Sequence, residues 1–197
     1  MGASSILTCE VFNLYSLELQ LFINFVLTRS SIDVKDISYS GMISSTTGYI
    51  RLNRFSRYAS RDFQKELVEL TKKDISQLII DLRDNTGGLL SAAVNILDML
   101  TDKDIPLVST KGRTKESNRS FYSKRNPIIS KDVRIVVLIN QGSASASEIV
   151  AGALQDLDRG IVIGQKSYGK GLVQSAFQLD DKRAIKITTA RYYVCLL

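Results

Sequence analysis

The 197-residue sequence contains no histidine. Without histidine the chain cannot form a Ser-His-Asp triad, a Cys-His pair or a histidine-ligated zinc site. Cysteine is also scarce. Cys9 and Cys195 stand near opposite ends of the sequence, outside any C-x-x-C pattern, and predict neither a redox motif nor a disulfide framework. Any nucleophilic chemistry in this chain therefore needs a base other than histidine.

The N-terminal region lacks the features of a signal peptide and of a membrane span. No Lys or Arg precedes Arg29, so the basic segment that opens a signal peptide is missing. Residues 11–26 are apolar, but polar side chains interrupt them, and the run is shorter than the ~20 residues that a membrane helix needs. We interpret residues 1–27 as a helix or as the remnant of a neighbouring module.

The positive net charge of +6 is concentrated in one region. Between Lys111 and Arg134 eight basic residues face two acidic ones. A nucleic-acid surface needs aromatic side chains between its charges, and only Phe121 and Tyr122 are available there. We therefore predict that residues 101–132 form a long, solvated polar connection, and that nucleic acid is not a partner.

Apolar segments typical of strands alternate with amphipathic segments typical of helices. This pattern predicts strands at residues 47–52, 74–82, 133–139 and 160–164, and helices at 60–73 and 89–100. Residues 172–179 and 183–193 alternate in polarity on either side of a polar turn, which predicts a C-terminal β-hairpin. Together these elements predict an α/β fold in which helices flank a mixed sheet.

The segment Asn140–Glu148 connects a predicted strand to a predicted helix. Ser145 and Glu148 have the S-x-x-E spacing of a capping box, so the helix is predicted to begin at Ser145. A serine at that position lies at the positive end of the helix dipole, beside free backbone N–H groups that can stabilise an oxyanion. From this segment alone the alternative stays open that Ser143, Ser145 and Ser147 are only caps and small packing residues.

The glycine-bearing segment Gly164–Gly171 also allows a nucleotide-binding interpretation, which we reject. Its spacing approaches that of a phosphate-binding P-loop, but Gly171 stands where that loop needs a metal-binding Ser or Thr. The residues that follow alternate like a strand instead of opening a helix. Ser167 and Lys170 fit an S-x-x-K pattern, but the partner motifs of penicillin-recognising enzymes are missing.

Lys170 is the available base for the Ser145 hydroxyl, because the chain has no histidine and Ser-Lys dyads are a known alternative. An ordinary lysine keeps its proton at neutral pH, so a lysine base must lie in surroundings that exclude water. Gly169 and Gly171 permit close approach of the backbone on both sides of it. Considered without Ser145, Lys170 fits a solvent-facing turn better than it fits a base.

Three separated motifs, in this order, resemble those of the C-terminal processing peptidases, also called tail-specific proteases. They are Leu82–Gly88 (LRDNTGG), the serine segment 140–148, and Gly169-Lys170-Gly171 with Gln174 four residues after the lysine. The resemblance covers residues 48–193 clearly and residues 25–47 more weakly. It implies a ClpP/crotonase-like catalytic core.

The resemblance also implies roles for particular residues. Ser145 is expected to be the nucleophile, Lys170 the general base, and Gln174 the residue that orients the lysine. The backbone N–H groups of Gly88 and Ala146 are expected to form the oxyanion hole. The 25-residue spacing between the serine and the lysine fits the family. No metal and no cofactor is expected to take part.

By the same resemblance, residues 1–27 are expected to be the remnant of a truncated PDZ-type module. Residues 28–197 are expected to be the catalytic core, truncated at its C-terminus. The implied function is that of a serine endopeptidase of the cell envelope or periplasm, which cuts polypeptides near their C-terminal tails through an acyl-enzyme. The alternative is a catalytically silent module that binds peptides or apolar ligands on the same core. The sequence does not indicate an oligomeric state.

Overall fold

The computed structural model describes residues 9–16, 21–28 and 34–194, with side chains from residue 34 onward. The chain divides into two compact units, Met1–Val34 and Lys35–Leu197. In the first unit β1 (Cys9–Ser16) and β2 (Leu21–Thr28) pair antiparallel. The prediction of a helix in residues 1–27 is therefore wrong. The apolar residues of this segment include Val, Ile, Phe and Tyr, which favour strands. Its apolar content alone therefore did not distinguish a helix from a strand. The assignment to a PDZ-type remnant stays a prediction.

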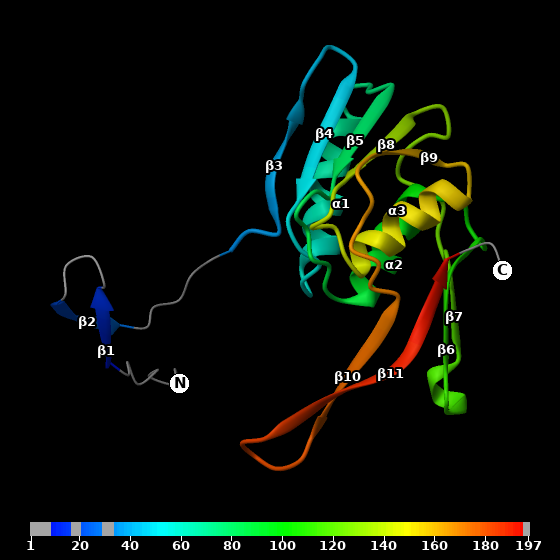
Figure 1. The fold of residues 1–197 in the computed structure, drawn as a ribbon. Coiled ribbons are helices and arrows are strands. Elements are labelled where there is room, and N and C mark those ends of the chain that lie inside the picture. The colour runs from blue at the N-terminus through cyan, green and yellow to red at the C-terminus, as the bar shows by residue number, and fades with distance from the viewer. Residues whose placement is uncertain (1–8, 17–20, 29–33, 195–197) are drawn as a thin grey trace, which may run out of the picture. The chain divides into compact units, whose positions relative to one another are not determined.

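The second unit is built on a five-stranded mixed sheet with the order β3-β4-β5-β8-β9 (Figure 1). The strands are β3 (Ile37–Met42), β4 (Thr47–Leu52), β5 (Gln77–Asp81), β8 (Arg134–Ile139) and β9 (Gly160–Gly164). Strands β4, β5, β8 and β9 run parallel to one another, and β3 pairs antiparallel with β4 at the edge of the sheet. Continuous apolar runs are typical of parallel strands covered by helices, and the predicted mixed sheet is confirmed.

The helices are α1 (Ala59–Thr71), α2 (Leu90–Leu100) and α3 (Ala146–Asp156). Helix α1 buries one stripe, made by Phe63, Leu67 and Leu70, as its amphipathic pattern predicts. Helix α2 contacts both α1 and α3, and all three contribute to one hydrophobic core with the sheet. None of the helices that the structure describes is long and apolar enough to span a bilayer.

A second, antiparallel sheet has the order β10-β11-β6-β7. It contains β6 (Pro106–Gly112), β7 (Arg119–Tyr122), β10 (Leu172–Gln178) and β11 (Ala184–Val194). Strands β10 and β11 are the predicted hairpin. The prediction of a solvated connection at residues 101–132 is wrong, because β6, a 3₁₀ turn (Lys115–Ser117) and β7 lie there. Leu107 and Val108 are buried, so β6 is anchored despite the basic residues around it.

Candidate active site

The predicted catalytic segments follow the carboxyl ends of three parallel strands, β5, β8 and β9. In an open α/β sheet these ends meet at the same edge, where functional sites gather. Ser145 is the N-cap residue of α3, as predicted. Its backbone has φ 56° and ψ −112°, which a residue with a side chain rarely adopts. Such strain persists only where the surrounding structure enforces it, and it concentrates at functional sites.

The three serines of the segment differ in what their hydroxyls do. Ser143 and Ser147 are fully buried, and their hydroxyls donate to the carbonyl oxygens of Leu82 at 2.7 Å and Asn85 at 2.8 Å. These two serines tie the start of α3 to the turn after β5. Ser145 is partly exposed, and its hydroxyl donates to no group in the described part of the chain. Ser143 and Ser147 are therefore packing residues, whereas Ser145 caps α3 and keeps a hydroxyl that donates to no described group.

The glycine turn after β5 lies directly against Ser145. A Cβ atom added to Gly87, whose φ is +95°, would lie 2.8 Å from the Ser145 Cβ and 2.9 Å from the Ala146 nitrogen. Both approaches are closer than any side chain tolerates, so the turn can reach Ser145 only because this position is glycine.

The N–H groups of Gly88 and Ala146 donate no hydrogen bond within the described residues. Gly88 forms a parallel bridge with Phe55, in which Phe55 N–H donates to Gly87 O at 3.0 Å and Leu89 N–H to Phe55 O at 2.8 Å. This pattern does not use the N–H of Gly88. Ala146 is the first residue of α3, where an N–H has no partner inside the helix. Free donors of this kind are what an oxyanion hole requires.

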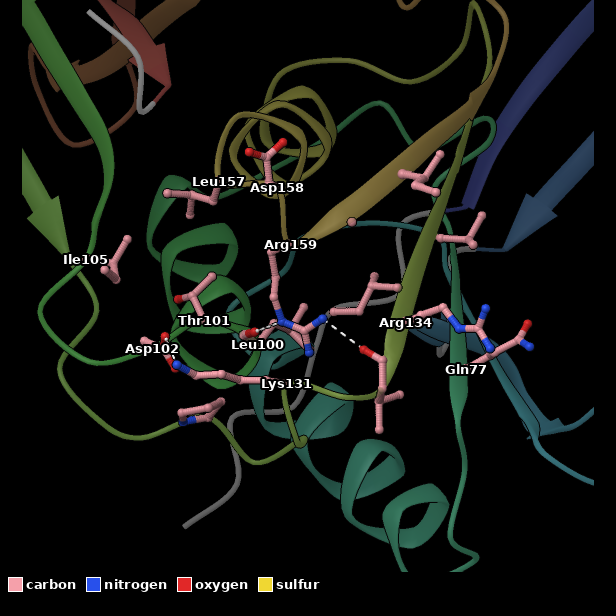
Figure 2. A pocket seen from close by; sticks show the side chains of 16 residues that line it. Gln77, Leu100, Thr101, Asp102, Ile105, Lys131, Arg134, Leu157, Asp158 and Arg159 are labelled. Atoms are coloured by element: carbon pink, nitrogen blue, oxygen red, sulfur yellow. Dashed lines mark hydrogen bonds and ion pairs between the residues drawn. The ribbon is translucent and has the colours of Figure 1, made fainter.

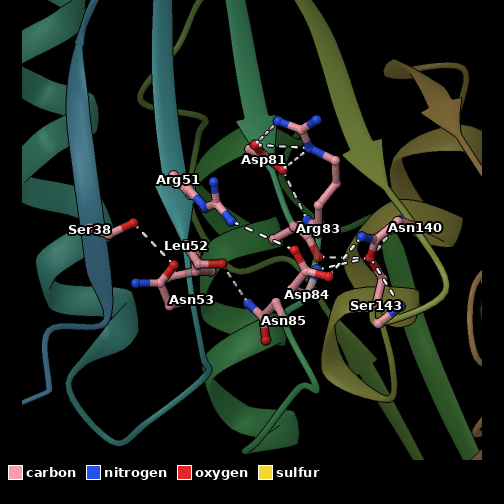
Figure 3. A network of polar contacts seen from close by, with 12 residues as sticks. Ser38, Arg51, Leu52, Asn53, Asp81, Arg83, Asp84, Asn85, Asn140 and Ser143 are labelled. Carbon is pink, nitrogen blue, oxygen red and sulfur yellow. Dashed lines mark hydrogen bonds and ion pairs between the residues drawn. The ribbon is translucent and has the colours of Figure 1, made fainter.

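A polar network lies at the turn after β5, and only part of it is buried (Figure 3). Asp81 is fully buried at the end of β5 and accepts hydrogen bonds from the Tyr49 hydroxyl at 2.5 Å and the Arg83 guanidinium at 2.6 Å. Burial alone would raise the pKa of Asp81, but these hydrogen bonds outweigh it and hold the pKa below its usual value. Just after β8, the side-chain amide of Asn140 donates to the Asp84 carboxylate at 2.8 Å. Its amide oxygen accepts from the backbone N–H of Asp84, also at 2.8 Å.

The LRDNTGG motif covers part of this turn, but its pattern predicted no role for Asp81, Arg83 or Asn140. A carboxylate at the end of an otherwise apolar, buried strand is a usable signal, because a buried charge must be paired.

Glu148 joins the serine segment to the lysine segment. One of its carboxylate oxygens accepts hydrogen bonds from the N–H groups of Ser145 at 2.7 Å and Lys170 at 2.9 Å. The other accepts from the Gly169 N–H at 2.6 Å and the Ser167 hydroxyl at 2.7 Å. The S-x-x-E spacing predicted Glu148 only as part of a capping box. The structure adds that the same carboxylate holds the backbones of both predicted dyad residues.

The side chains of the predicted dyad are less closely organised than its backbone. Lys170 is partly exposed, so the described residues do not supply the water-free surroundings expected of a lysine base. Within the described chain no hydrogen bond joins the Lys170 ammonium to Ser145 or to Gln174. Gln174 is exposed on β10, opposite Thr188 of β11. Its predicted role is not expressed as a contact.

A cavity of about 710 Å³ lies at the other end of the sheet (Figure 2). Its lining includes Gln77, Arg134 and Gly160, with which β5, β8 and β9 begin. Since Ser145 follows the carboxyl end of β8, this cavity is not the site of the predicted dyad. The Arg159 side chain contributes to its wall and donates to backbone carbonyl groups.

Comparison with known proteins identifies a family and a fold. The model described as "Peptidase family S41" matches residues 46–194. The "C-terminal processing peptidase, chloroplastic" of Tetradesmus obliquus is 34% identical over 179 residues, which cover 84% of this chain and 38% of the relative. A "carboxyl-terminal-processing protease" of Picosynechococcus is 43% identical over 145 residues, which cover 74% of this chain and 34% of the relative.

Among solved structures, the "photosystem II D1 C-terminal processing protease" superposes with a TM-score of 0.71 at 30% identity. The match covers 95% of this chain and 51% of that protein. This chain thus spans about a third of the length of the two curated relatives and about half of the solved one.

Proposed function

The chain belongs to peptidase family S41, and from this membership we propose that it is a serine endopeptidase that cleaves polypeptides near their C-terminus. The names of its relatives support C-terminal processing as the reaction class. The observation that carries the proposal is the backbone of Ser145, held in a strained conformation at the start of α3 beside two unused N–H donors. A serine that serves only as a cap has no need of that conformation.

In the proposed reaction the Ser145 oxygen attacks the scissile carbonyl carbon. Lys170 takes the hydroxyl proton and later delivers it to the leaving amine. The N–H groups of Gly88 and Ala146 stabilise the oxyanion of each tetrahedral intermediate. The ester formed on Ser145 is hydrolysed by water, which releases the new carboxyl end of the substrate and restores the serine. Gln174 orients the lysine without exchanging a proton.

The geometry supports the oxyanion part of this mechanism most strongly. Ala146 N–H lies at the positive end of α3, and Gly87 brings the turn that carries Gly88 against Ser145. Both donors belong to backbone whose position is fixed by buried hydrogen bonds, so no reorganisation is needed as charge develops on the substrate.

The test is cleavage of an unstructured peptide by the wild-type chain and by Ser145→Ala and Lys170→Arg. Either change should lower kcat by at least ~10³-fold, because each removes a group on which the covalent step depends. A guanidinium keeps its proton at any pH that proteins survive, so arginine cannot act as the base. Gln174→Ala should cost less, since it removes orientation and not the base.

Lys166→Arg is the matched control, because Lys166 is an exposed lysine on the same loop. It should keep the wild-type rate. Substantial activity in Lys170→Arg would show that the lysine is not the base. Peptide binding without cleavage by the wild-type chain would favour the silent binding module instead. A location in the cell envelope or periplasm stays a prediction from the family.

A further inference from the structure

We infer that Tyr192 is a positioning residue that holds Lys170 next to Ser145, an inference that rests on the proposed function. Tyr192 is half-buried on β11, and its hydroxyl donates a hydrogen bond to the carbonyl oxygen of Lys170. The same hydroxyl lies 3.2 Å from the carbonyl oxygen of Ser145. One side chain, from a strand remote in sequence, therefore bridges the backbones of both predicted dyad residues.

The contacts of Tyr192 complement those of Glu148. Glu148 accepts the N–H groups of Ser145 and Lys170, whereas Tyr192 donates its single proton toward the carbonyl groups of the same two residues. The backbones of Ser145 and Lys170 are thus linked through their N–H groups by Glu148 of α3, and through their carbonyl groups by Tyr192 of β11. The Tyr192 N–H also donates to Gly171 O at 3.2 Å.

The lysine loop depends on these hydrogen bonds because packing does little to hold it. Gly169 has φ +86°, and a Cβ atom added to Gly169 or Gly171 would meet no atom within 4 Å. Glycines on both sides of Lys170, in open space, leave the loop many alternative conformations. Strand β11 is in turn fixed by its pairing with β6, in which Tyr192 lies opposite Thr110.

The Tyr192 hydroxyl remains protonated, and so able to donate, at neutral pH. Burial raises the pKa of Tyr192, and the neighbouring Glu148 carboxylate raises it further. The Tyr192 hydroxyl therefore keeps the proton that it donates to the Lys170 carbonyl well above neutral pH.

Tyr192→Phe tests the inference, because it removes one oxygen and keeps the ring. We expect kcat to fall ~10- to 100-fold, since small misplacements of a reacting group cost rates of this order. KM should stay within about twofold, because no substrate contact is removed. Amide hydrogen exchange in residues 165–171 should become faster.

Tyr193→Phe is the matched control. Tyr193 is the next residue on β11, and its ring lies 5.1 Å from the Lys111 ammonium nitrogen. Neighbouring residues of a strand point to opposite faces, so its hydroxyl is not directed at the lysine loop. This variant should keep wild-type kinetics and exchange. Replacement of Tyr192 by 4-aminophenylalanine, which restores a donor, should recover kcat and the protection of residues 165–171.

The exchange measurement separates this inference from the proposed function, because it needs no turnover. If the wild-type chain cleaves no peptide, the proposed function fails, and exchange in residues 165–171 still decides whether Tyr192 holds the loop. Unchanged kcat and unchanged exchange in Tyr192→Phe would overturn the inference. If that variant does not fold, 3,5-difluorotyrosine at position 192, whose hydroxyl ionises at lower pH than that of tyrosine, replaces it. Once corrected for intrinsic exchange, amide exchange in residues 165–171 should become faster above the pH at which absorbance shows the difluorophenol to ionise. Exchange that does not change there would overturn the inference.

Discussion

At the scale of single residues, Gly87 sets how closely the turn after β5 approaches Ser145, the proposed nucleophile. Its φ of +95° strains any residue with a side chain, and an added Cβ would lie 2.5 Å from the Ala144 carbonyl oxygen and 2.8 Å from the Ser145 Cβ. Both atoms are attached to backbone that hydrogen bonds hold at the start of α3, so they cannot move away cheaply.

We therefore predict that Gly87→Ala lowers the free energy of unfolding by ~1–3 kcal/mol. It should also reduce kcat strongly, because the clash displaces Ser145 and the Ala146 N–H. Urea unfolding and peptide cleavage measure the two effects. Gly41→Ala on β3 is the control, since its closest neighbour is the movable end of the Tyr39 side chain at 3.1 Å. A stable Gly87→Ala chain with wild-type kcat would contradict the close approach.

At the scale of elements, the segment after β7 is docked onto α2 through one carboxylate. Asp98 of α2 is 5% exposed and accepts hydrogen bonds from the Lys124 N–H, the Arg125 N–H and the Arg125 guanidinium, the last at 2.7 Å. Burial alone would raise the pKa of Asp98, but these three hydrogen bonds outweigh it and hold the pKa below its usual value. A segment predicted to be solvated is thus packed.

We predict that Arg125→Ser lowers the free energy of unfolding by about 1 kcal/mol at neutral pH, since the guanidinium is about half exposed. A carboxylate with a lowered folded-state pKa contributes stability above its unfolded pKa, and that contribution is lost as the pH falls through the folded value. The difference between variant and wild type should therefore vanish in acid. Urea unfolding at neutral pH and at about pH 2 measures this.

Lys124→Ser is the control for that experiment. Only the backbone N–H of Lys124 contacts Asp98, and its side chain is exposed, so stability should change by less than about 0.5 kcal/mol. Equal losses in the two variants would mean that the ion pair with Asp98 contributes nothing specific.

At the scale of the whole second unit, Lys35–Leu197, Arg159 connects parts of the chain that lie far apart in sequence. Its guanidinium donates to the carbonyl oxygens of Leu100 at 2.9 Å, Val133 at 2.9 Å and Ser130 at 3.1 Å. These carbonyls belong to the end of α2 and to the approach to β8, so one side chain after α3 satisfies both. Burial lowers the pKa of Arg159, yet an arginine still remains charged.

Arg159→Met should lower the free energy of unfolding by ~2–4 kcal/mol, because two partly buried carbonyl groups and one exposed carbonyl group lose a charged donor. Thermal and urea unfolding measure the loss. Arg134→Met is the control, since Arg134 lines the same cavity with an exposed side chain that makes no hydrogen bond among the described residues. Similar losses in both variants would show that the lost charge matters and not the link.

The sequence by itself determined the four parallel strands of the central sheet and the helices that pack with it. It also determined the start of α3 at Ser145 and the exclusion of histidine chemistry. Each of these depends on local features: continuous apolar runs for parallel strands, helical periodicity, the S-x-x-E spacing, and composition. The motif resemblance named Ser145, Lys170, Gln174, Gly88 and Ala146 as site residues, and their roles stay predictions.

The tertiary structure alone decided how residues 101–132 fold and what holds the proposed dyad. Strand β6 is stabilised by pairing with β11, about 80 residues further on, and local composition carries no trace of that pairing. Likewise, nothing in the spacing of Glu148 and Tyr192 shows that both reach the backbones of Ser145 and Lys170. Those contacts exist because two sheets and a helix end converge there, and such convergence is a property of packing across the chain.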